Sequence, residues 1–143
     1  PGSVKVLDAK TLLIPERRGN RRADSLRNII ETGRVGLLFM IPGLSETLRI
    51  NGKARVIRDA SLLDQLAVEG KTPIIAVAVE VDEAFLQCGK AVHRSKLWDA
   101  RSDARQSERA CFAQMLIDQA KIEGQSVEAL QANLEESYAN NLY

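Results

Sequence analysis

Arginine is concentrated in one short segment of the chain, residues 16–27. The segment reads ERRGNRRADSLR and contains Arg17, Arg18, Arg21, Arg22 and Arg27. Arg21 and Arg22 directly precede a predicted helix, whose first turn offers backbone N–H groups and the positive end of the helix dipole. Gly19 lets the backbone approach an anion closely, and Ser25 offers a hydroxyl donor. Guanidinium groups beside a helix amino terminus indicate a phosphate site.

The same arginines have two other interpretations. In a solvated loop they would pair with nearby acids, Glu16, Asp24 and Glu31. A nucleic-acid or phosphoprotein-binding module could also use the segment, but no aromatic residues are interleaved for base stacking. The net charge of +1 excludes a globally basic protein, so we expect no nucleic-acid partner.

A second polar cluster lies at residues 90–98, KAVHRSKLW. It offers cations, a hydroxyl at Ser95 and the tryptophan Trp98, which we expect to pack. His93 has no carboxylate or nucleophile at short spacing with which it could form a catalytic dyad. We therefore interpret His93 as a surface or structural residue. The sequence lacks both GxGxxG and GxxxxGK[ST], which argues against a Rossmann dinucleotide site and a P-loop.

Composition narrows the class of protein. The chain has 143 residues, with 20 Lys and Arg against 19 Asp and Glu, which suits one domain of ordinary size. It has no apolar run long enough to span a membrane, and no secretory leader opens it, so we expect a cytoplasmic protein. Cys88 and Cys111 have no zinc-site spacing with His93. We therefore expect no metal and interpret both cysteines as buried, reduced thiols.

The first ninety residues carry strand patterns interrupted by short helices. Alternation over 47–57 is typical of a strand with one polar side, and Gly52 in its middle predicts a bulge or a close backbone approach. The apolar run 35–41 predicts a central strand buried on both faces. The remaining predicted elements are strands at 4–7, 11–14 and 73–81 and helices at 23–31 and 60–69. Short strands at this spacing favour a small antiparallel barrel.

The last forty residues change to a helical pattern. Apolar residues recur at helical spacing over 107–123 and 126–142, with Ser126 as the predicted N-cap of the second helix. We interpret these stripes as packing faces. The expected organisation is a barrel core at residues 1–98, incomplete at its N-terminus, and a helical extension at 99–143 that packs on the barrel or on a dimer partner.

Four motifs in order carry a family resemblance: Leu12–Ile30, Arg34–Gly43, Glu46–Gly52 and Arg94–Trp98. In them the chain resembles a bacterial branch of the pyridoxamine 5'-phosphate oxidase-related family of FMN-binding split barrels, and the tail LEESYANNLY is also similar. The resemblance implies a mainly β fold with helices (α+β), an antiparallel split β-barrel of FMN-binding type. It also implies a homodimer with FMN sites at the subunit interface, and that the family's usual N-terminal helix and strands are absent from this sequence.

The resemblance also assigns candidate cofactor contacts. Arg21 and Arg22 fall where the oxidases place an Arg-Lys pair on the FMN phosphate. Pro15 and Glu16 fall on the strand end whose backbone faces the flavin ring, and Thr47 falls on a glutamine near the flavin. The other candidate contacts are Asn20, Ser25, Arg94 and Ser95, of which Arg94 and Ser95 correspond to a later Gln-Ser pair.

Three departures from the oxidase pattern bear on function. Pro15-Glu16 replaces a Tyr-Thr pair, Thr47 replaces the glutamine, and the oxidases' C-terminal Arg-x-His substrate motif has no counterpart. These changes are compatible with FMN binding and argue against pyridoxamine phosphate as substrate. The expected function is an FMN-dependent oxidoreductase in which the cofactor carries the redox chemistry and no catalytic residue is assigned. The alternative is a non-catalytic flavin- or tetrapyrrole-binding protein on the same fold.

Overall fold

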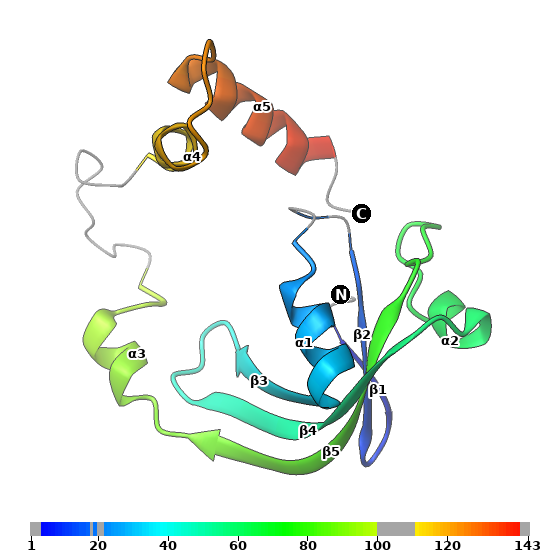
Figure 1. Cartoon of the computed structure of the whole chain (residues 1–143). Coiled ribbons are helices and arrows are strands. Elements are labelled where there is room, and N and C mark those ends of the chain that lie inside the picture. Colours follow the sequence, from blue (N-terminus) through cyan, green and yellow to red (C-terminus); the bar gives the residue numbers. More distant parts are fainter. Residues whose placement is uncertain (1–3, 18, 20–21, 100–110, 141–143) are drawn as a thin grey trace. The chain divides into compact units, whose positions relative to one another are not determined.

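The chain forms two units, one within residues 1–100 and the other within residues 101–142. The structure, a computed structural model, describes residues 4–17, 19, 22–99 and 111–140 (Figure 1). The first unit contains the sheet and three helices, and the second contains two helices. Each unit is therefore described separately below.

The first unit is built on one antiparallel five-stranded sheet with the strand order β1-β2-β5-β4-β3. Its strands are β1 (Lys5–Asp8), β2 (Thr11–Pro15), β3 (Arg34–Met40), β4 (Thr47–Ile57) and β5 (Ala76–Gln87). The hairpin predicted at 4–7 and 11–14 is confirmed, because β1 pairs with β2. Together with the helices this is the expected α+β fold, an antiparallel sheet of the split-barrel type.

The position of β3 corrects one prediction. The run 35–41 was expected to form a central strand, but β3 lies at the edge of the sheet and pairs, among the described residues, with β4 alone. Its side chains alternate: Val35, Leu37 and Phe39 pack into the core, whereas Leu38 and Met40 are exposed. A continuous apolar run cannot distinguish a buried central strand from an edge strand whose second face is open.

Gly52 shows both features expected of it. The register of β4 against β5 shifts between Asn51 and Gly52, which is a β-bulge. A Cβ atom on Gly52 would lie against the backbone carbonyl oxygen of Glu80 and 3.2 Å from Cγ1 of Val79. The two long central strands can approach this closely because residue 52 has no side chain.

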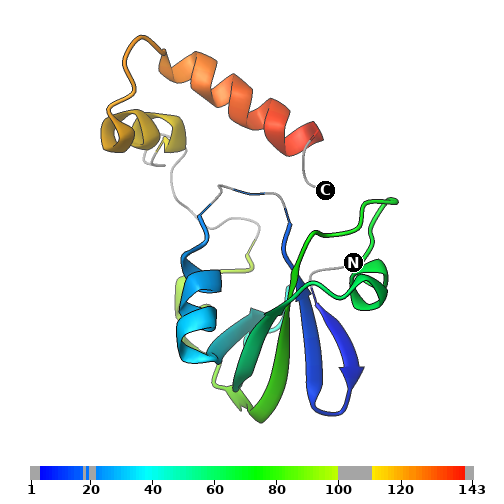
Figure 2. The same cartoon turned by 45° about the vertical axis from the view of Figure 1, so that its right-hand side comes forward.

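Apolar side chains pack on both faces of the sheet. On one face α1 (Asp24–Thr32) contributes Ile29 to a cluster with residues of β2, β4 and β5. On the other face α2 (Ala60–Asp64) and the residues after it contribute Leu63 and Leu66 to a cluster with Leu13. Figure 1 and Figure 2 show α1 within the curve of the sheet and α2 on the opposite side. The helix predicted over 60–69 is shorter, because the chain turns after Asp64 and bridges Val68 to Lys71.

The end of β5 continues into a short helix. The strand begins three residues later than predicted and extends six residues further, to Gln87. Gly89 then precedes α3 (Lys90–Ser95).

The prediction that Cys88 and Cys111 are buried is wrong, since both thiols are free and exposed. Each lies outside a regular element, at the edge of one, where the backbone does not turn the side chain toward the core.

The second unit is a pair of helices in contact, α4 (Phe112–Ala120) and α5 (Val127–Asn140). The backbone N–H of Ala129 donates to Oγ of Ser126 at 3.1 Å, which confirms the predicted N-cap. Ala113 of α4 is fully buried. Within the described part of the chain, no helix is both long and apolar enough to cross a bilayer.

Candidate functional site

Arg22 lies directly before the amino end of α1, as predicted. Its Nε and Nη2 atoms contact Oδ2 of Asp24 at 3.1 and 3.0 Å, and both side chains are mostly exposed, at 77% and 63%. Ala23 is the N-cap residue and supplies no side-chain hydrogen bond. Ser25, also exposed, lies in the first turn. This helix end therefore has an N-cap residue without a side-chain acceptor, beside a guanidinium that already binds a carboxylate.

The contact with Asp24 is one that the solvated-loop interpretation predicted. An exposed ion pair of this kind contributes about 0–1 kcal/mol, because water screens it and two side chains must be ordered. A phosphate offers the same oxygen acceptors with more charge. The pair is thus a weak competitor for an anion at the start of α1, and it does not decide between the two interpretations.

Arg17, in contrast, binds backbone carbonyls in the loop between α2 and β5. Its Nη2 donates to the backbone carbonyl of Leu66 at 2.6 Å, and its Nη1 donates to the carbonyl of Lys71 at 3.4 Å. The side chain is partly buried, and its Nε atom is inaccessible to solvent. Among the described arginines of the segment, Arg17 therefore binds the loop between α2 and β5, whereas Arg22 binds Asp24.

Two of the predicted cofactor contacts, Asn20 and Arg21, lie outside the described residues, as does Arg18. Pro15 and Glu16 lie at the end of β2. Pro15 is buried and pairs with Ala76, and the N–H of Glu16 donates to the carbonyl of Ile75 at 3.1 Å. The Glu16 amide is therefore committed to the sheet, while its side chain is exposed.

Thr47 begins β4 and lies opposite Met40 of β3 and Gln87 of β5. The loop before it contacts the α3 segment in two places. A Cβ atom on Gly89 would lie 2.7 Å from the carbonyl carbon of Ser45, and Nε1 of Trp98 donates to the carbonyl of Leu44 at 2.5 Å. The structure thus brings the α3 segment, with Arg94 and Ser95, to the end of the sheet where Thr47 lies.

The α3 residues themselves make local contacts. Arg94 is exposed, and the Ser95 hydroxyl donates to the carbonyl of Val92 within the helix at 3.1 Å. The indole N–H of Trp98 donates to Leu44, but the side chain is exposed and belongs to neither buried cluster, so the expected packing role is not confirmed. His93 lies on the exposed side of the same short helix.

The candidate residues fall into two groups at opposite ends of the sheet. The β2-end group is Pro15 and Glu16, which Arg22 and Ser25 follow in the chain at the start of α1, and the β4-end group is Thr47, with Arg94 and Ser95 of α3 nearby. Pro15 pairs with the first residue of β5, and Thr47 pairs with its last residue, Gln87. Eleven residue steps of β5 separate these partners, which is about 35 Å of strand. Pro15 and Thr47 therefore lie at opposite ends of β5.

The sequence analysis did not predict a row of polar side-chain pairs between neighbouring strands. These pairs lie on the sheet face that α2 covers only in part. Lys53 pairs with Glu80 at 3.6 Å, and Arg34 pairs with Asp82 at 2.7 Å. Asn51 donates to Glu83, and Arg49 donates to Gln87. The alternation of β4 predicted its polar side, but the acidic partners lie mostly beyond residue 81, where the predicted strand ended.

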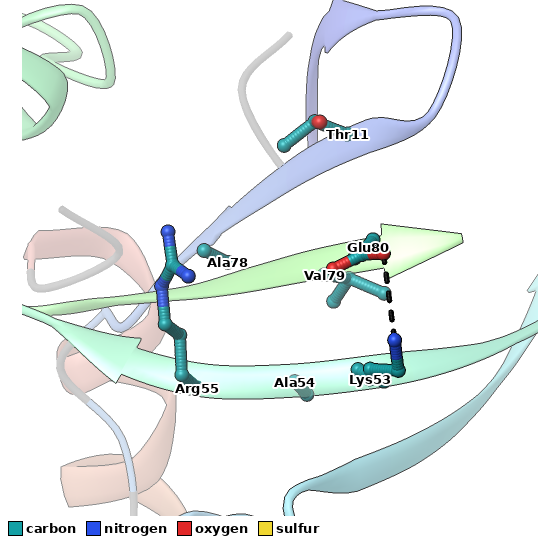
Figure 3. A pocket seen from close by; sticks show the side chains of 7 residues that line it. All are labelled: Thr11, Lys53, Ala54, Arg55, Ala78, Val79 and Glu80. Carbon is teal, nitrogen blue, oxygen red and sulfur yellow. Dashed lines mark ion pairs between the residues drawn. The ribbon is translucent and has the colours of Figure 1, made fainter. Parts of the chain in front are cut away.

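A hollow of about 310 Å³ lies on the same face (Figure 3). Figure 3 shows the Lys53–Glu80 pair at one end of it and Arg55 at the other, with Ala78 between. The charges there are mixed and the side chains of the cations are exposed. The described residues contain no cluster of His, Cys, Asp and Glu that could hold a metal.

Among the described residues, two carboxyl groups have a lowered pKa, and neither belongs to the candidate site. The pKa of Asp59 is lowered by hydrogen bonds from the Ser61 hydroxyl and the Leu62 N–H at the start of α2. Hydrogen bonds from the Lys10 backbone and the Thr11 side chain lower the pKa of Asp8 in the β1–β2 turn. Both carboxylates stabilise local turns.

Comparison with known proteins gives one family and one fold. The family model described as pyridoxamine 5'-phosphate oxidase matches residues 1–88. Among solved structures, the chain is similar to HupZ of Group A Streptococcus, with 17% identity over 60% of this chain and 70% of that one, and a TM-score of 0.50. A histidine-to-alanine variant of HupZ matches with 17% identity over 59% and 73% of the two chains and a TM-score of 0.49. At this identity the likeness to HupZ shows the fold alone, and no curated protein sequence matches the chain.

Proposed function

The chain belongs to the pyridoxamine 5'-phosphate oxidase family, and from that premise we propose that it is an FMN-binding flavoprotein acting as an FMN-dependent oxidoreductase. The observation that carries the proposal is Arg22 beside the uncapped amino end of α1. An amino end with unpaired N–H groups and a neighbouring guanidinium suits a phosphate monoester. The family premise then favours the phosphate of FMN.

The residues at the start of α1 offer hydrogen-bond donors of the kind that bind a phosphate. Arg22 directs two nitrogen atoms at one carboxylate oxygen, and these donors would bind phosphate oxygens instead. The Ser25 hydroxyl and the N–H groups of the first turn add uncharged donors. Asp24 opposes binding, because it competes for Arg22 and repels an anion. The proposal therefore assigns Arg22 to bind the phosphate and Asp24 to limit its affinity.

When bound, FMN supplies the electron transfer between substrate and acceptor. The chain's own residues hold and orient it. The end of β2 is well suited to a fixed contact surface, because Pro15 is buried and the Glu16 amide is bonded to Ile75. Neither residue can move without disturbing the pairing with β5. We assign these residues to positioning the ring relative to the phosphate.

A homodimer explains how the β4-end group joins the same site. About 35 Å of strand separates the β5 partners of Pro15 and Thr47. In a two-fold dimer, Thr47, Arg94 and Ser95 of one protomer would instead face the β2-end group of its partner. The polar face of β4 and β5 that α2 covers only in part, with exposed Leu38, Met40 and Phe85 nearby, offers a surface for such a contact. We therefore place the proposed FMN sites between two subunits.

Cofactor titration tests the binding part of this proposal. The purified chain should bind FMN, show a flavin absorbance spectrum and lose that colour on reduction with dithionite. A chain that takes up no FMN would refute it. Assays with NAD(P)H, oxygen and B6 vitamers then test catalysis, and saturable binding without turnover in any of them would favour the non-catalytic alternative.

Subunit complementation tests the shared site. A heterodimer of Arg22→Ala and Arg94→Ala protomers has one site with both substitutions and one site with neither, if each site combines the two groups across the interface. Each homodimer should bind FMN weakly, and the heterodimer should regain one tight site per dimer. If both groups acted within one protomer, every site in the heterodimer would carry one substitution and no tight site would return.

A further inference from the structure

The row of polar pairs between β4 and β5 is interrupted at Arg55. Lys53 lies directly opposite Glu80, and their side chains form an ion pair at 3.6 Å. Arg55 follows on the same face of β4, but it lies opposite Ala78, which offers no acceptor. Among the described residues, Arg55 makes no hydrogen bond or ion pair. Its guanidinium therefore has donors available for a ligand.

The hollow of about 310 Å³ lies at this interruption. Ala78 is 7% exposed and belongs to the buried cluster beneath α2, so it forms an apolar floor. Because its side chain is a methyl group, space remains over β5 that Glu80 occupies in the neighbouring row. Figure 3 shows the guanidinium of Arg55 reaching from β4 toward Ala78, with the Lys53–Glu80 pair at the other end. The hollow thus has an available cation at one end and an ion pair at the other.

The ion pair leaves Glu80 able to bind a further partner. The distance of 3.6 Å from Nζ of Lys53 to Oε1 of Glu80 exceeds that of a hydrogen bond. The two side chains are 60% and 64% exposed, and a carboxylate can accept several hydrogen bonds at once. Glu80 can therefore accept hydrogen bonds from a ligand while Lys53 stays beside it. The Thr11 side chain also lines the hollow, but it already hydrogen-bonds Asp8.

The arrangement of charge and apolar surface selects the chemistry of a ligand. An arginine fork suits a carboxylate, which it can bind through two parallel hydrogen bonds. Glu80 attracts an ammonium group and repels a second negative charge, which disfavours a phosphate dianion. The methyl group of Ala78 suits a short alkyl chain. These features together favour a molecule with a carboxylate at one end and a primary amine at the other.

We propose that this hollow is a binding site for a small aminocarboxylate, in which Arg55 binds the carboxylate and Glu80 binds the amine. This inference goes beyond the proposed function, because none of the residues that line the hollow is a candidate FMN contact. The hollow is also separate from the apolar part of the proposed subunit contact, since exposed Leu38 and Phe85 both lie opposite Arg49, earlier in β4.

The test titrates the full chain, without flavin, with 4-aminobutanoate, butanoate and butylamine. The backbone amide NMR signals of residues 53–55 and 78–80 report binding at the hollow. We expect saturable shifts with 4-aminobutanoate and a dissociation constant on the order of 1 mM, which a ligand of this size can reach. Butanoate and butylamine should each bind at least about fivefold more weakly, because each lacks one charged contact.

Two variants separate the ends of the ligand. Arg55→Ala should weaken binding of 4-aminobutanoate and butanoate about fivefold or more, while butylamine affinity changes less than about twofold. Glu80→Gln should weaken 4-aminobutanoate and butylamine by a similar factor without weakening butanoate. Arg58→Ala, which removes an exposed arginine between β4 and α2, is the matched control, and each affinity should stay within about twofold of the original.

Every other outcome overturns the proposal. Absence of saturable shifts at these amides would mean that the hollow binds no aminocarboxylate. Butanoate or inorganic phosphate binding as tightly as 4-aminobutanoate would show a site for anions in general, and an equal loss in Arg58→Ala would show an effect of overall charge. A change of sedimentation coefficient in Arg55→Ala, without ligand binding to the unsubstituted chain, would assign Arg55 to a subunit contact. Because flavin is absent from these titrations, a failure to bind FMN would refute the proposed function and leave this proposal standing.

Discussion

Replacing Arg22 with alanine removes the charged group on which the proposed phosphate site depends. A hydrogen bond to a charged group contributes about 1.5–3 kcal/mol when it is well shielded. Arg22 is 77% exposed, so water screens much of that contribution, and its contact with Asp24 must be given up at up to about 1 kcal/mol. A net loss of roughly 1–2 kcal/mol remains, which corresponds to a five- to thirtyfold weaker binding of FMN.

The assay is a fluorescence titration of FMN and riboflavin at low and moderate salt. The loss in Arg22→Ala should be confined to FMN and should shrink as salt rises, because screening weakens the contact with the phosphate. Arg27→Ala is the matched control, since Arg27 is an exposed arginine on the same helix, and it should change FMN affinity by less than about twofold. Unchanged FMN affinity in Arg22→Ala, or an equal loss in Arg27→Ala, would show that the phosphate binds elsewhere or through general charge.

Three further predictions follow from particular contacts. Asp24→Asn should bind FMN about three- to tenfold more tightly, because it removes a competitor for Arg22 and a like charge near the phosphate; a loss of affinity in the same titration would contradict the assignment. Gly52→Ala should lower the free energy of unfolding by about 1–3 kcal/mol or more, since its Cβ would meet backbone of β5, whereas Gly36→Ala should cost less because its Cβ meets a side-chain oxygen at 3.1 Å; equal urea midpoints for the two variants would refute the close approach. The pKa of Asp59 is lowered, so its ionised form stabilises the fold at a pH above the ordinary value of 3.8, and this contribution is lost as the pH falls below that value. Over this pH range the urea midpoint of unfolding should therefore fall less steeply with pH in Asp59→Asn than in the unsubstituted chain. Identical dependence of the urea midpoint on pH in the two proteins would contradict the prediction.

The sequence predicted the local features whose cause lies within a few residues. The hairpin of β1 and β2, the bulge at Gly52 and the cap at Ser126 all follow from short-range chemistry, and the structure confirms them. The place of β3 at the sheet edge could not be predicted, because hydrophobicity alone does not reveal how many neighbours a strand has. The length of β5 was underestimated since its second half carries acids, which pair with cations of β4 that only the register identifies.

The candidate site was predictable at its helix end and not at its sheet end. The place of Arg22 before α1 follows from local pattern, and the structure confirms it. The division of the candidate residues between two ends of β5 depends on strand order and register, which no spacing in the sequence encodes. Whether each residue contacts FMN stays a prediction for the titrations above.

Burial and partner type separate the tasks of the two arginines. Arg17 is partly buried and binds carbonyls, and a buried guanidinium that lost these acceptors would be left poorly solvated. Exchanging its partners for a ligand would therefore be unfavourable. Arg22 is exposed and holds a carboxylate through a weak ion pair, so water or an anion can replace that partner with little loss. A ligand-binding cation must be able to exchange its partner, whereas a structural cation keeps it. By this criterion Arg22 is the ligand candidate and Arg17 holds the loop between α2 and β5, although the two lie five residues apart in one arginine-rich segment.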